Sequence, residues 1–221
     1  MSNTNWAIKR KQLSLVKAAY ASQGRSPVIV DASLRLECSM AANQQNFQFY
    51  VGTGQGTTYN TETRLDLNDG FSIFDIAIYV ASPASATSTI FKLYSYPQAA
   101  VFSTSNVATS LNGFYNQGKL NISKDQVNYL ENYPVLNHRF APMIQDGFTT
   151  GYTTTGATAP NAVDSFDGTQ DGYSPLATNI NITGRDSLNI NISLPAGLAA
   201  VETYQRAVLV FRGFKAYNVA R

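Results

Sequence analysis

The sequence contains a single cysteine and a single histidine, and each scarcity excludes a class of protein. With Cys38 alone, no disulfide can form within the chain, so a small disulfide-held fold is excluded. With His138 as the only imidazole, neither a His-rich zinc site nor a Cys/His cluster can be assembled. We therefore expect Cys38 to be a small buried apolar side chain and His138 to be structural.

Charge is also scarce, since charged residues make up only 14% of the chain, against about 25% in an average soluble domain. A coiled coil is excluded, because such chains are rich in Glu, Lys and Ala. No apolar run approaches the ~18 residues of a transmembrane helix, so we expect no membrane span. The N-terminal residues also lack the apolar stretch of a secretory signal.

Motifs of cofactor binding and catalysis are missing as well. The glycine-rich stretch at 52–58 (GTGQGTT) lacks a further glycine at Thr57 and a following helix, both of which a dinucleotide fingerprint needs. We expect it to be a turn. No Gly-x-Ser-x-Gly elbow accompanies His138, so a hydrolase triad is not indicated.

Carboxylates give no clearer signal. Asp164, Asp167 and Asp171 lack the spacing of a calcium-binding EF-hand, and no Glu closes that loop. Glu62 with Asp66, or Asp69 with Asp75, could form a glycosidase pair, but the ordinary expectation is surface carboxylates near Arg64. We therefore predict that the protein is not an enzyme and that it has no catalytic residue, no metal and no cofactor.

Two segments are predicted to be helical. Residues 4–23 place Trp6, Val16 and Tyr20 near one face at helical spacing, and a glycine and a proline follow shortly after. Residues 107–117 form a shorter candidate, with apolar side chains on one side. The first helix is strongly basic, because residues 1–30 hold five basic residues and no acid.

The rest of the chain reads as short strands separated by turn signals. We expect strands at 27–31, 34–38, 46–51, 71–81, 89–94, 120–123, 127–133 and 207–217. The last of these is apolar on both faces at its start, as a central strand between two layers would be.

The clearest strand signal lies at residues 178–194. Residues 178–183 alternate strictly, 184–186 supply a turn, and 188–194 alternate again. This pattern predicts a β-hairpin with one apolar face and one face of Asn and Ser.

Together these features predict an all-β protein, namely an antiparallel β-sandwich or single jelly roll with an N-terminal α-helix and one short internal helix. Residues 1–25 are expected to form a basic helical arm, and 26–221 a single β-sandwich domain. The low-complexity stretch at about 146–175, rich in Gly, Thr and Asp, is predicted to be a long functional or disordered loop.

In overall style the chain resembles virion structural proteins of bacteriophages, both capsid and capsid-associated. The resemblance spans most of the chain and is carried by residues 114–120 (FYNQGKL), 129–134 (YLENYP) and 207–214 (AVLVFRGF). It implies a shell protein that associates with itself and with other virion proteins, assembled in the host cytoplasm and located in the virion. Low charge with abundant Asn, Thr, Ser and Tyr suits hydrogen-bonded, partly wet subunit contacts.

Two groups of residues are candidates for these contacts. Five basic residues are expected to face packaged nucleic acid, without reading its sequence, or a neighbouring subunit: Lys9, Arg10, Lys11, Lys17 and Arg25. Six others are expected to make assembly contacts: Trp6, Tyr20, Asn179, Asn181, Asn189 and Asn191. The alternative function is a glycan-binding or adhesive β-sandwich, of the head-decoration or fibre type, that uses the 146–175 loop.

Overall fold

The computed structural model describes most of the chain. The described residues are 3–53, 55–56, 59–97, 101–102, 104, 106–140 and 172–219, with side chains described from residue 8 onward. The side chain of Trp6 therefore lies outside them. So do Asp164, Asp167 and Asp171, together with all but the last four residues of the expected 146–175 loop.

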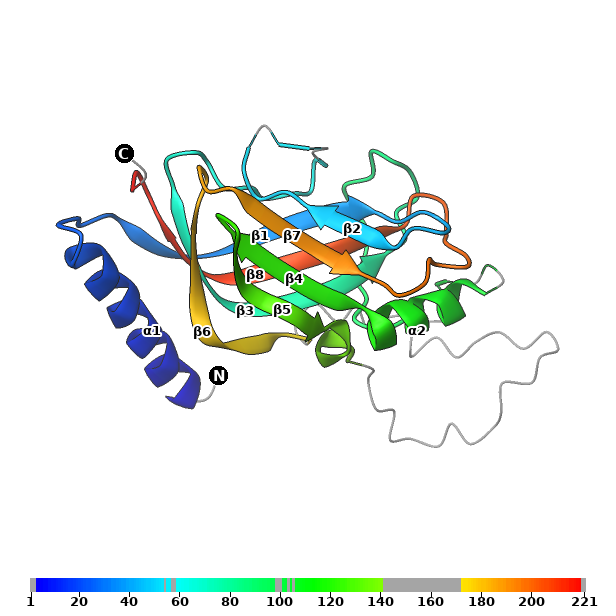
Figure 1. Ribbon diagram of the computed structural model, residues 1–221, viewed down its shortest axis with the longest axis horizontal. Coiled ribbons are helices and arrows are strands. Elements are labelled where there is room, and N and C mark those ends of the chain that lie inside the picture. Colours follow the sequence, from blue (N-terminus) through cyan, green and yellow to red (C-terminus); the bar gives the residue numbers. More distant parts are fainter. Residues whose placement is uncertain are drawn as a thin grey trace.

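The described part of the chain is predominantly strand. In chain order the elements are α1 (Asn3–Ala21), β1 (Ile29–Ser39), β2 (Asn46–Phe49), β3 (Gly70–Ala81), α2 (Val107–Gln117), β4 (Lys119–Lys124), β5 (Val127–Pro134), the 3-10 helix η1 (Val135–His138), β6 (Ser174–Thr183), β7 (Leu188–Ser193) and β8 (Arg206–Ala216) (Figure 1). Both predicted helices are confirmed within two residues at either end.

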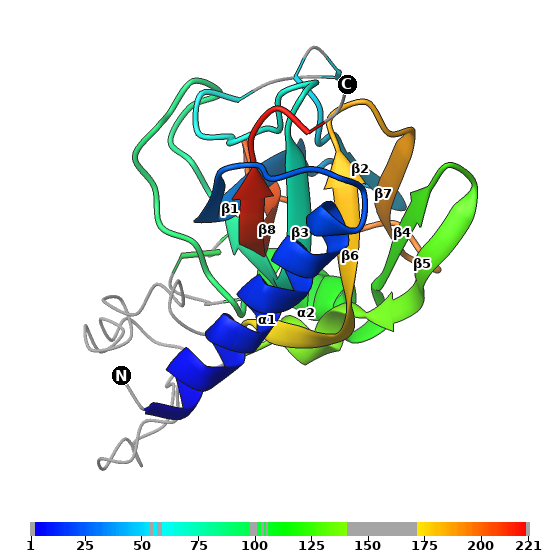
Figure 2. The same ribbon diagram turned by 90° about the vertical axis from the view of Figure 1, so that its left-hand side faces the viewer.

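The strands form two antiparallel sheets that pack as a sandwich (Figures 1 and 2). Sheet A has the order β1-β8-β3-β6, and sheet B has the order β2-β7-β4-β5. Within them β1 pairs with β8, β2 with β7, β3 with β6 and β4 with β5, so the pairing proceeds from the two ends of the chain inward. The predicted antiparallel β-sandwich with an N-terminal helix and a short internal helix is confirmed.

The predicted hairpin at 178–194 is wrong. β6 pairs with β3 in sheet A, whereas β7 pairs with β2 and β4 in sheet B. The link between them is held against the segment before β3 rather than closing a hairpin, because the Gly184 amide donates to the Asp69 carbonyl oxygen at 3.1 Å. A Cβ at Gly184 would also collide with the backbone of Asp66.

Two smaller expectations also differ. The expected strands 27–31 and 34–38 are one continuous strand, β1, because Ala32 and Ser33 pair with β8 without interruption. The expected strand 89–94 makes only an isolated bridge between Tyr94 and Val80. Its side chains serve as a cover instead, since Leu93 packs on the outer face of sheet A while Ile90 is 94% exposed.

The main core fills the space between the sheets. Its largest members are aromatic, and Phe47 on β2 meets Phe114 on α2 edge to face with ring centroids 5.4 Å apart. The buried Tyr115 hydroxyl donates to the Tyr94 carbonyl oxygen at 3.1 Å, which satisfies its polar end. Helix α2 thereby closes one end of the sandwich (Figure 1).

The outer faces of the two sheets differ. Sheet A is covered at one part by α1, which packs on Phe74 and Phe214, and at another by Leu93 and its neighbours above Tyr79 and Val208. Sheet B turns its outer face away from both helices, toward the viewer in Figure 1. The difference explains why β3 and β8 are apolar on both faces whereas β4 and β7 alternate.

Candidate assembly surfaces

Helix α1 is docked on the body of the protein. Val16 is 1% exposed and packs against Phe74 and Phe214, with Leu13 and Tyr20 at the margin of the contact. The two phenylalanine rings meet edge to face at 5.7 Å. Figure 2 shows the helix lying across the end of the sandwich in front of sheet A. Tyr20, expected to contact a neighbouring subunit, is therefore partly buried within its own chain.

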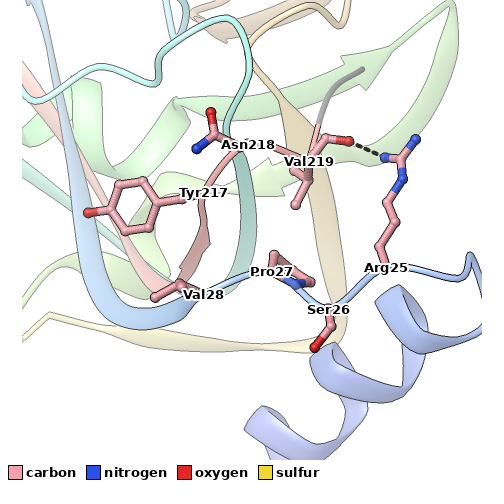
Figure 3. A pocket seen from close by; sticks show the side chains of 7 residues that line it. All are labelled: Arg25, Ser26, Pro27, Val28, Tyr217, Asn218 and Val219. Carbon is pink, nitrogen blue, oxygen red and sulfur yellow. Dashed lines mark hydrogen bonds between the residues drawn. The ribbon is translucent and has the colours of Figure 1, made fainter.

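The basic residues of this N-terminal region divide into two groups. Lys9 forms an exposed ion pair with Asp31 at 2.7 Å. Arg25 donates to the carbonyl oxygen of Val219, which ties the end of the helix to the C-terminal segment (Figure 3). The other three are exposed: Arg10, Lys11 and Lys17.

The junction between α1 and the C-terminal segment encloses a pocket of about 450 Å³. Its lining residues come from the two chain segments that meet there: Arg25, Ser26, Pro27, Val28, Tyr217, Asn218 and Val219 (Figure 3). Its one cation, Arg25, already donates to Val219. The pocket therefore offers little that could act on a substrate, and we interpret it as the seam where α1 joins the sandwich.

The four candidate asparagines do not share one face. Asn181 lies on the outer side of sheet A, where its Oδ1 accepts from Ser72 Oγ at 2.6 Å and from Asn179 Nδ2 at 3.0 Å. Asn189 and Asn191 lie on the outer side of sheet B, because the isoleucines between and beside them point into the core. A single asparagine face built from both segments, as the hairpin implied, does not exist.

Sheet B carries a row of amide side chains on its outer face. Gln48, Asn191 and Asn121 stand side by side on β2, β7 and β4, in register with one another. Asn121 also accepts a hydrogen bond from the Asn132 amide at 2.9 Å. We call the outer face of sheet B, with these amides together with Asn46 and Asn189, the amide face. It is mainly polar, and it also carries Lys119, two residues before Asn121 on β4.

Two further exposed patches were not singled out by the sequence. Helix α1 exposes Ile8 (52%) and Leu15 (53%), and β5 exposes Val127 (59%) and Tyr129 (46%). The exposed patch on α1 could have been found from the sequence, because Ile8 and Leu15 lie outside the predicted apolar face of the helix. In β5 the apolar residues alternate in a way that also fits a half-buried strand.

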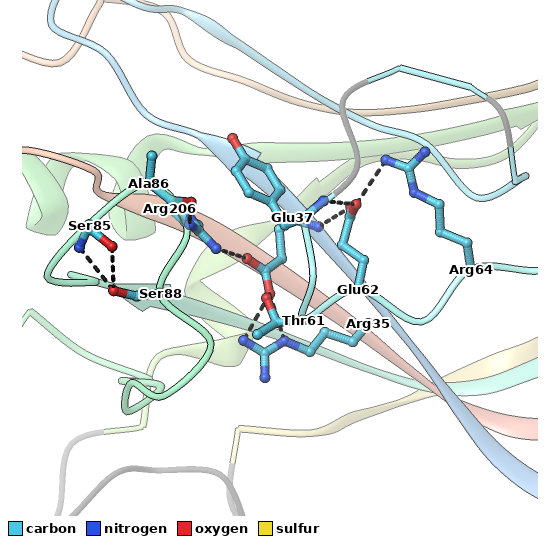
Figure 4. Close-up of polar contacts among 10 residues, drawn as sticks. Arg35, Glu37, Thr61, Glu62, Arg64, Ser85, Ala86, Ser88 and Arg206 are labelled. Atoms are coloured by element: carbon cyan, nitrogen blue, oxygen red, sulfur yellow. Dashed lines mark hydrogen bonds and ion pairs between the residues drawn. The ribbon is translucent and has the colours of Figure 1, made fainter.

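A buried ionic cluster holds the edge of sheet A (Figure 4). Glu37 on β1 receives Arg206 Nη1 at 2.8 Å and Arg35 Nε at 2.9 Å, and the Thr61 hydroxyl also donates to it. The Arg206 guanidinium lies over the Tyr59 ring, 4.1 Å from its centroid. The side chain of Glu37 is 0% exposed and that of Arg206 is 3% exposed, so the pair is withdrawn from water.

A second carboxylate extends this cluster. Glu62 Oε1 accepts from the Glu37 amide at 2.9 Å, and Glu62 Oε2 accepts from the Tyr59 amide at 2.8 Å and pairs with Arg64 at 3.0 Å. The expectation that Glu62 is a surface carboxylate is wrong, since its side chain is 0% exposed, and that of its partner Arg64 is 4% exposed. Each carboxylate of the cluster is bound to a cation, and the cluster fastens residues 59–64 along β1.

His138 lies in the buried interior at the end of η1. Its Nδ1 is 3.1 Å from the carbonyl oxygen of Gly172. Burial lowers the pKa of His138 from 6.5 to about 4, against the opposing effect of backbone hydrogen bonds at Gly172 and Ile76. The imidazole is therefore neutral at pH 7. Among the described residues, no group of three or more His, Cys, Asp or Glu side chains lies close enough together to hold a metal ion.

Comparison with protein-family models and with curated proteins found no match to this chain. The functional proposal therefore rests on the fold and the surfaces of the protein. Within the part of the chain that the structure describes, no helix is long and apolar enough to cross a membrane.

Proposed function

We propose that the sandwich is a single jelly roll. The support is its strand order, β1-β8-β3-β6 in one sheet and β2-β7-β4-β5 in the other. The first strand pairs with the last, the second with the second to last, and so on inward to β4 and β5. This is the pairing of one long hairpin that is rolled into a barrel. Two nested Greek keys in eight strands are the pattern of jelly rolls, which recur in viral capsid and lectin domains.

We infer that the protein is a virion structural protein, a phage capsid subunit that self-assembles into a symmetric shell. The observation that carries this proposal is the jelly-roll strand order. The proposal gains support from surfaces suited to subunit contacts. The amide face of sheet B offers hydrogen-bond donors and acceptors with little charge to desolvate, and α1 and β5 expose apolar side chains. The role is structural rather than catalytic.

The partners follow from the same surfaces. The main partner is a second copy of the chain, in contacts repeated by symmetry, and other virion proteins meet the remaining surfaces. Lys11 and Lys17 are exposed on α1, as are Arg10 and the ion-paired Lys9, and this basic helix supplies the non-specific contact with packaged nucleic acid. The location is the virion.

The test is the mass of the purified full-length chain by light scattering across a concentration series, with negative-stain images of the same samples. A shell subunit gives rings, capsomer-sized species or closed particles. A chain that remains at 24.0 kDa throughout overturns self-assembly. In that case glycan-array binding would test the alternative adhesive function of the 146–175 loop.

A further inference from the structure

Helix α1 has a buried stripe and an exposed stripe. Leu13, Val16 and Tyr20 face the body of the protein. Ile8 and Leu15 are spaced seven residues apart, which is about two helical turns, so they share one stripe, which lies roughly a quarter to a third of the way round the helix from the buried one. Both are about half exposed. Lys11 lies between them on the same side and is also exposed.

The charge of α1 decides what this stripe can meet. The helix contains no acidic residue in its 19 positions. Lys11 forms no ion pair with the described part of the chain, whereas Lys9 is paired with Asp31. Two copies of α1 packed against each other by a twofold axis would bring cation against cation. The partner of the stripe must therefore be a different surface, apolar and acidic.

Strand β5 carries such a surface. It is an edge strand of sheet B, so one side of its backbone has no neighbouring strand among the described residues (Figure 1). Val127, Tyr129 and Glu131 are all exposed along it, and register shifts in the pairing of β5 with β4 interrupt the strict alternation of its two faces. Glu131 forms no ion pair with any residue that the structure describes.

The two surfaces match in length. From Ile8 to Leu15 the helix rises about 10 Å, at ~1.5 Å per residue. From Val127 to Glu131 the strand extends about 13 Å, at ~3.3 Å per residue. Within one chain they cannot meet, because α1 packs on the outer face of sheet A and β5 is an edge of sheet B (Figure 2).

We propose that the stripe Ile8–Lys11–Leu15 of one chain docks on the β5 edge Val127–Tyr129–Glu131 of a second copy. The apolar side chains cover each other, and Lys11 approaches Glu131. The contact joins two different surfaces, so each copy has one of each, and repetition closes into a ring or continues along a shell. This inference specifies the subunit contact of the self-assembly proposed above and rests on it.

The contact is tested by mixing two variants that each lack one surface. The helix variant is Ile8→Gln with Leu15→Gln, and the strand variant is Val127→Thr with Tyr129→Thr. Gln and Thr suit helix and strand respectively, so neither variant should unfold. A matched control removes two other exposed apolar side chains, through Leu67→Gln with Ile90→Gln. All are measured by light scattering, with circular dichroism to check folding.

We expect the wild type and the control to assemble, and each variant alone to remain monomeric. An equal mixture of the two variants should stop at a heterodimer of twice the 24.0 kDa chain mass, because only one intact contact can form. If the variants assemble like the wild type, this contact is refuted while the shell proposal stands. If the wild type itself is monomeric at every concentration, both proposals are refuted.

A charge exchange tests the ion pair within the contact. Lys11→Glu should weaken assembly by about fivefold at low salt, and adding Glu131→Lys in the same chain should restore it. Lys17→Glu makes the same charge change on another side of α1 and should leave assembly unchanged. Equal weakening by Lys11→Glu and Lys17→Glu, with no restoration, would refute the pairing of Lys11 with Glu131.

Discussion

Replacing Glu37 by Gln should destabilise the protein far more than its small change in shape suggests. The carboxylate is the common acceptor for Arg206, Arg35 and Thr61, and its side chain is fully buried (Figure 4). Gln keeps the volume but removes the charge and one acceptor oxygen. The Arg206 guanidinium, only 3% exposed, would then lack its compensating anion.

The magnitude follows from the burial of the pair. Removing one partner of a buried ion pair costs about 3–5 kcal/mol, because the remaining charge stays desolvated. The exposed pair Lys9–Asp31 provides an internal comparison, since its 2.7 Å separation is close to the 2.8 Å of Glu37–Arg206 but its side chains are 55% and 61% exposed. Asp31→Asn should therefore cost less than about 1 kcal/mol.

Urea unfolding at pH 7, followed by circular dichroism, measures both variants against the wild type. For a chain of this length the expected loss for Glu37→Gln corresponds to a fall of about 10 °C in the melting temperature. The double variant Glu37→Gln with Arg206→Met should lose less than the sum of the single losses, because no buried cation remains opposite the amide. If Glu37→Gln and Asp31→Asn cost the same, burial does not decide the strength of these pairs and the reasoning is refuted.

Three further predictions follow from single buried or constrained positions. Because the pKa of His138 is lowered to about 4, the unfolded chain takes up its proton first as the pH falls below 6.5. The wild type should therefore lose roughly 3 kcal/mol of stability between pH 6.5 and 4 that His138→Gln does not lose, as denaturant titrations at several pH values would show. Gly213→Ala should unfold or aggregate, since a Cβ there would collide with the Ser72 carbonyl oxygen, whereas Gly113→Ala, which meets open space on α2, should raise stability by about 0.5–1 kcal/mol. Burial raises the pKa of the Cys38 thiol to about 11, so alkylation at pH 8 should be at least about tenfold slower in the folded protein than in urea; equal rates would contradict this.

Apolar runs and their alternation predicted most strands, and for four of them the form of the run also reflected whether the outer face is covered. The run at 71–81 and the start of 207–217 are apolar on both faces, and they became β3 and β8, the central strands of the sheet covered on both sides. The alternating runs at 46–51 and 188–194 became strands of the sheet with an open outer face. The local pattern of apolar residues thus indicates whether a strand is buried on one face or on both.

Pairing was not predictable in the same way. The segments 178–183 and 188–194 both place Ile toward the core and Asn toward solvent, a pattern equally suited to neighbours in one sheet or to facing strands in two. The choice depends on the link at 184–187, which is held by the Asp69 carbonyl oxygen more than a hundred residues earlier. A contact between residues so far apart in the chain cannot be predicted from the local sequence around either of them.

The candidate site shows the same limit. Glu37 and Arg206 are 169 residues apart, and each reads locally as an ordinary charged residue in or beside a strand. Glu62 was expected at the surface, because with Arg64 nearby a surface carboxylate is the ordinary case. Only the path of residues 59–64 along the edge of β1, closed by the Thr63 amide donating to the Arg35 carbonyl oxygen at 2.9 Å, removes them from water.

The covered outer face of sheet A limits where a contact of the proposed shell can form. This face is occupied from within the chain, by α1 at Phe74 and Phe214 and by Leu93 near Tyr79. Among the described surfaces, this leaves the amide face, the sheet edges and the exposed stripe of α1 for a neighbouring subunit. The amide face offers hydrogen bonds that water also satisfies, so its contacts add little net free energy. The stripe of α1 and the edge of β5 expose apolar area, whose burial drives association. The strength of assembly should thus come from the helix and the edge strand, and its geometry from the amides.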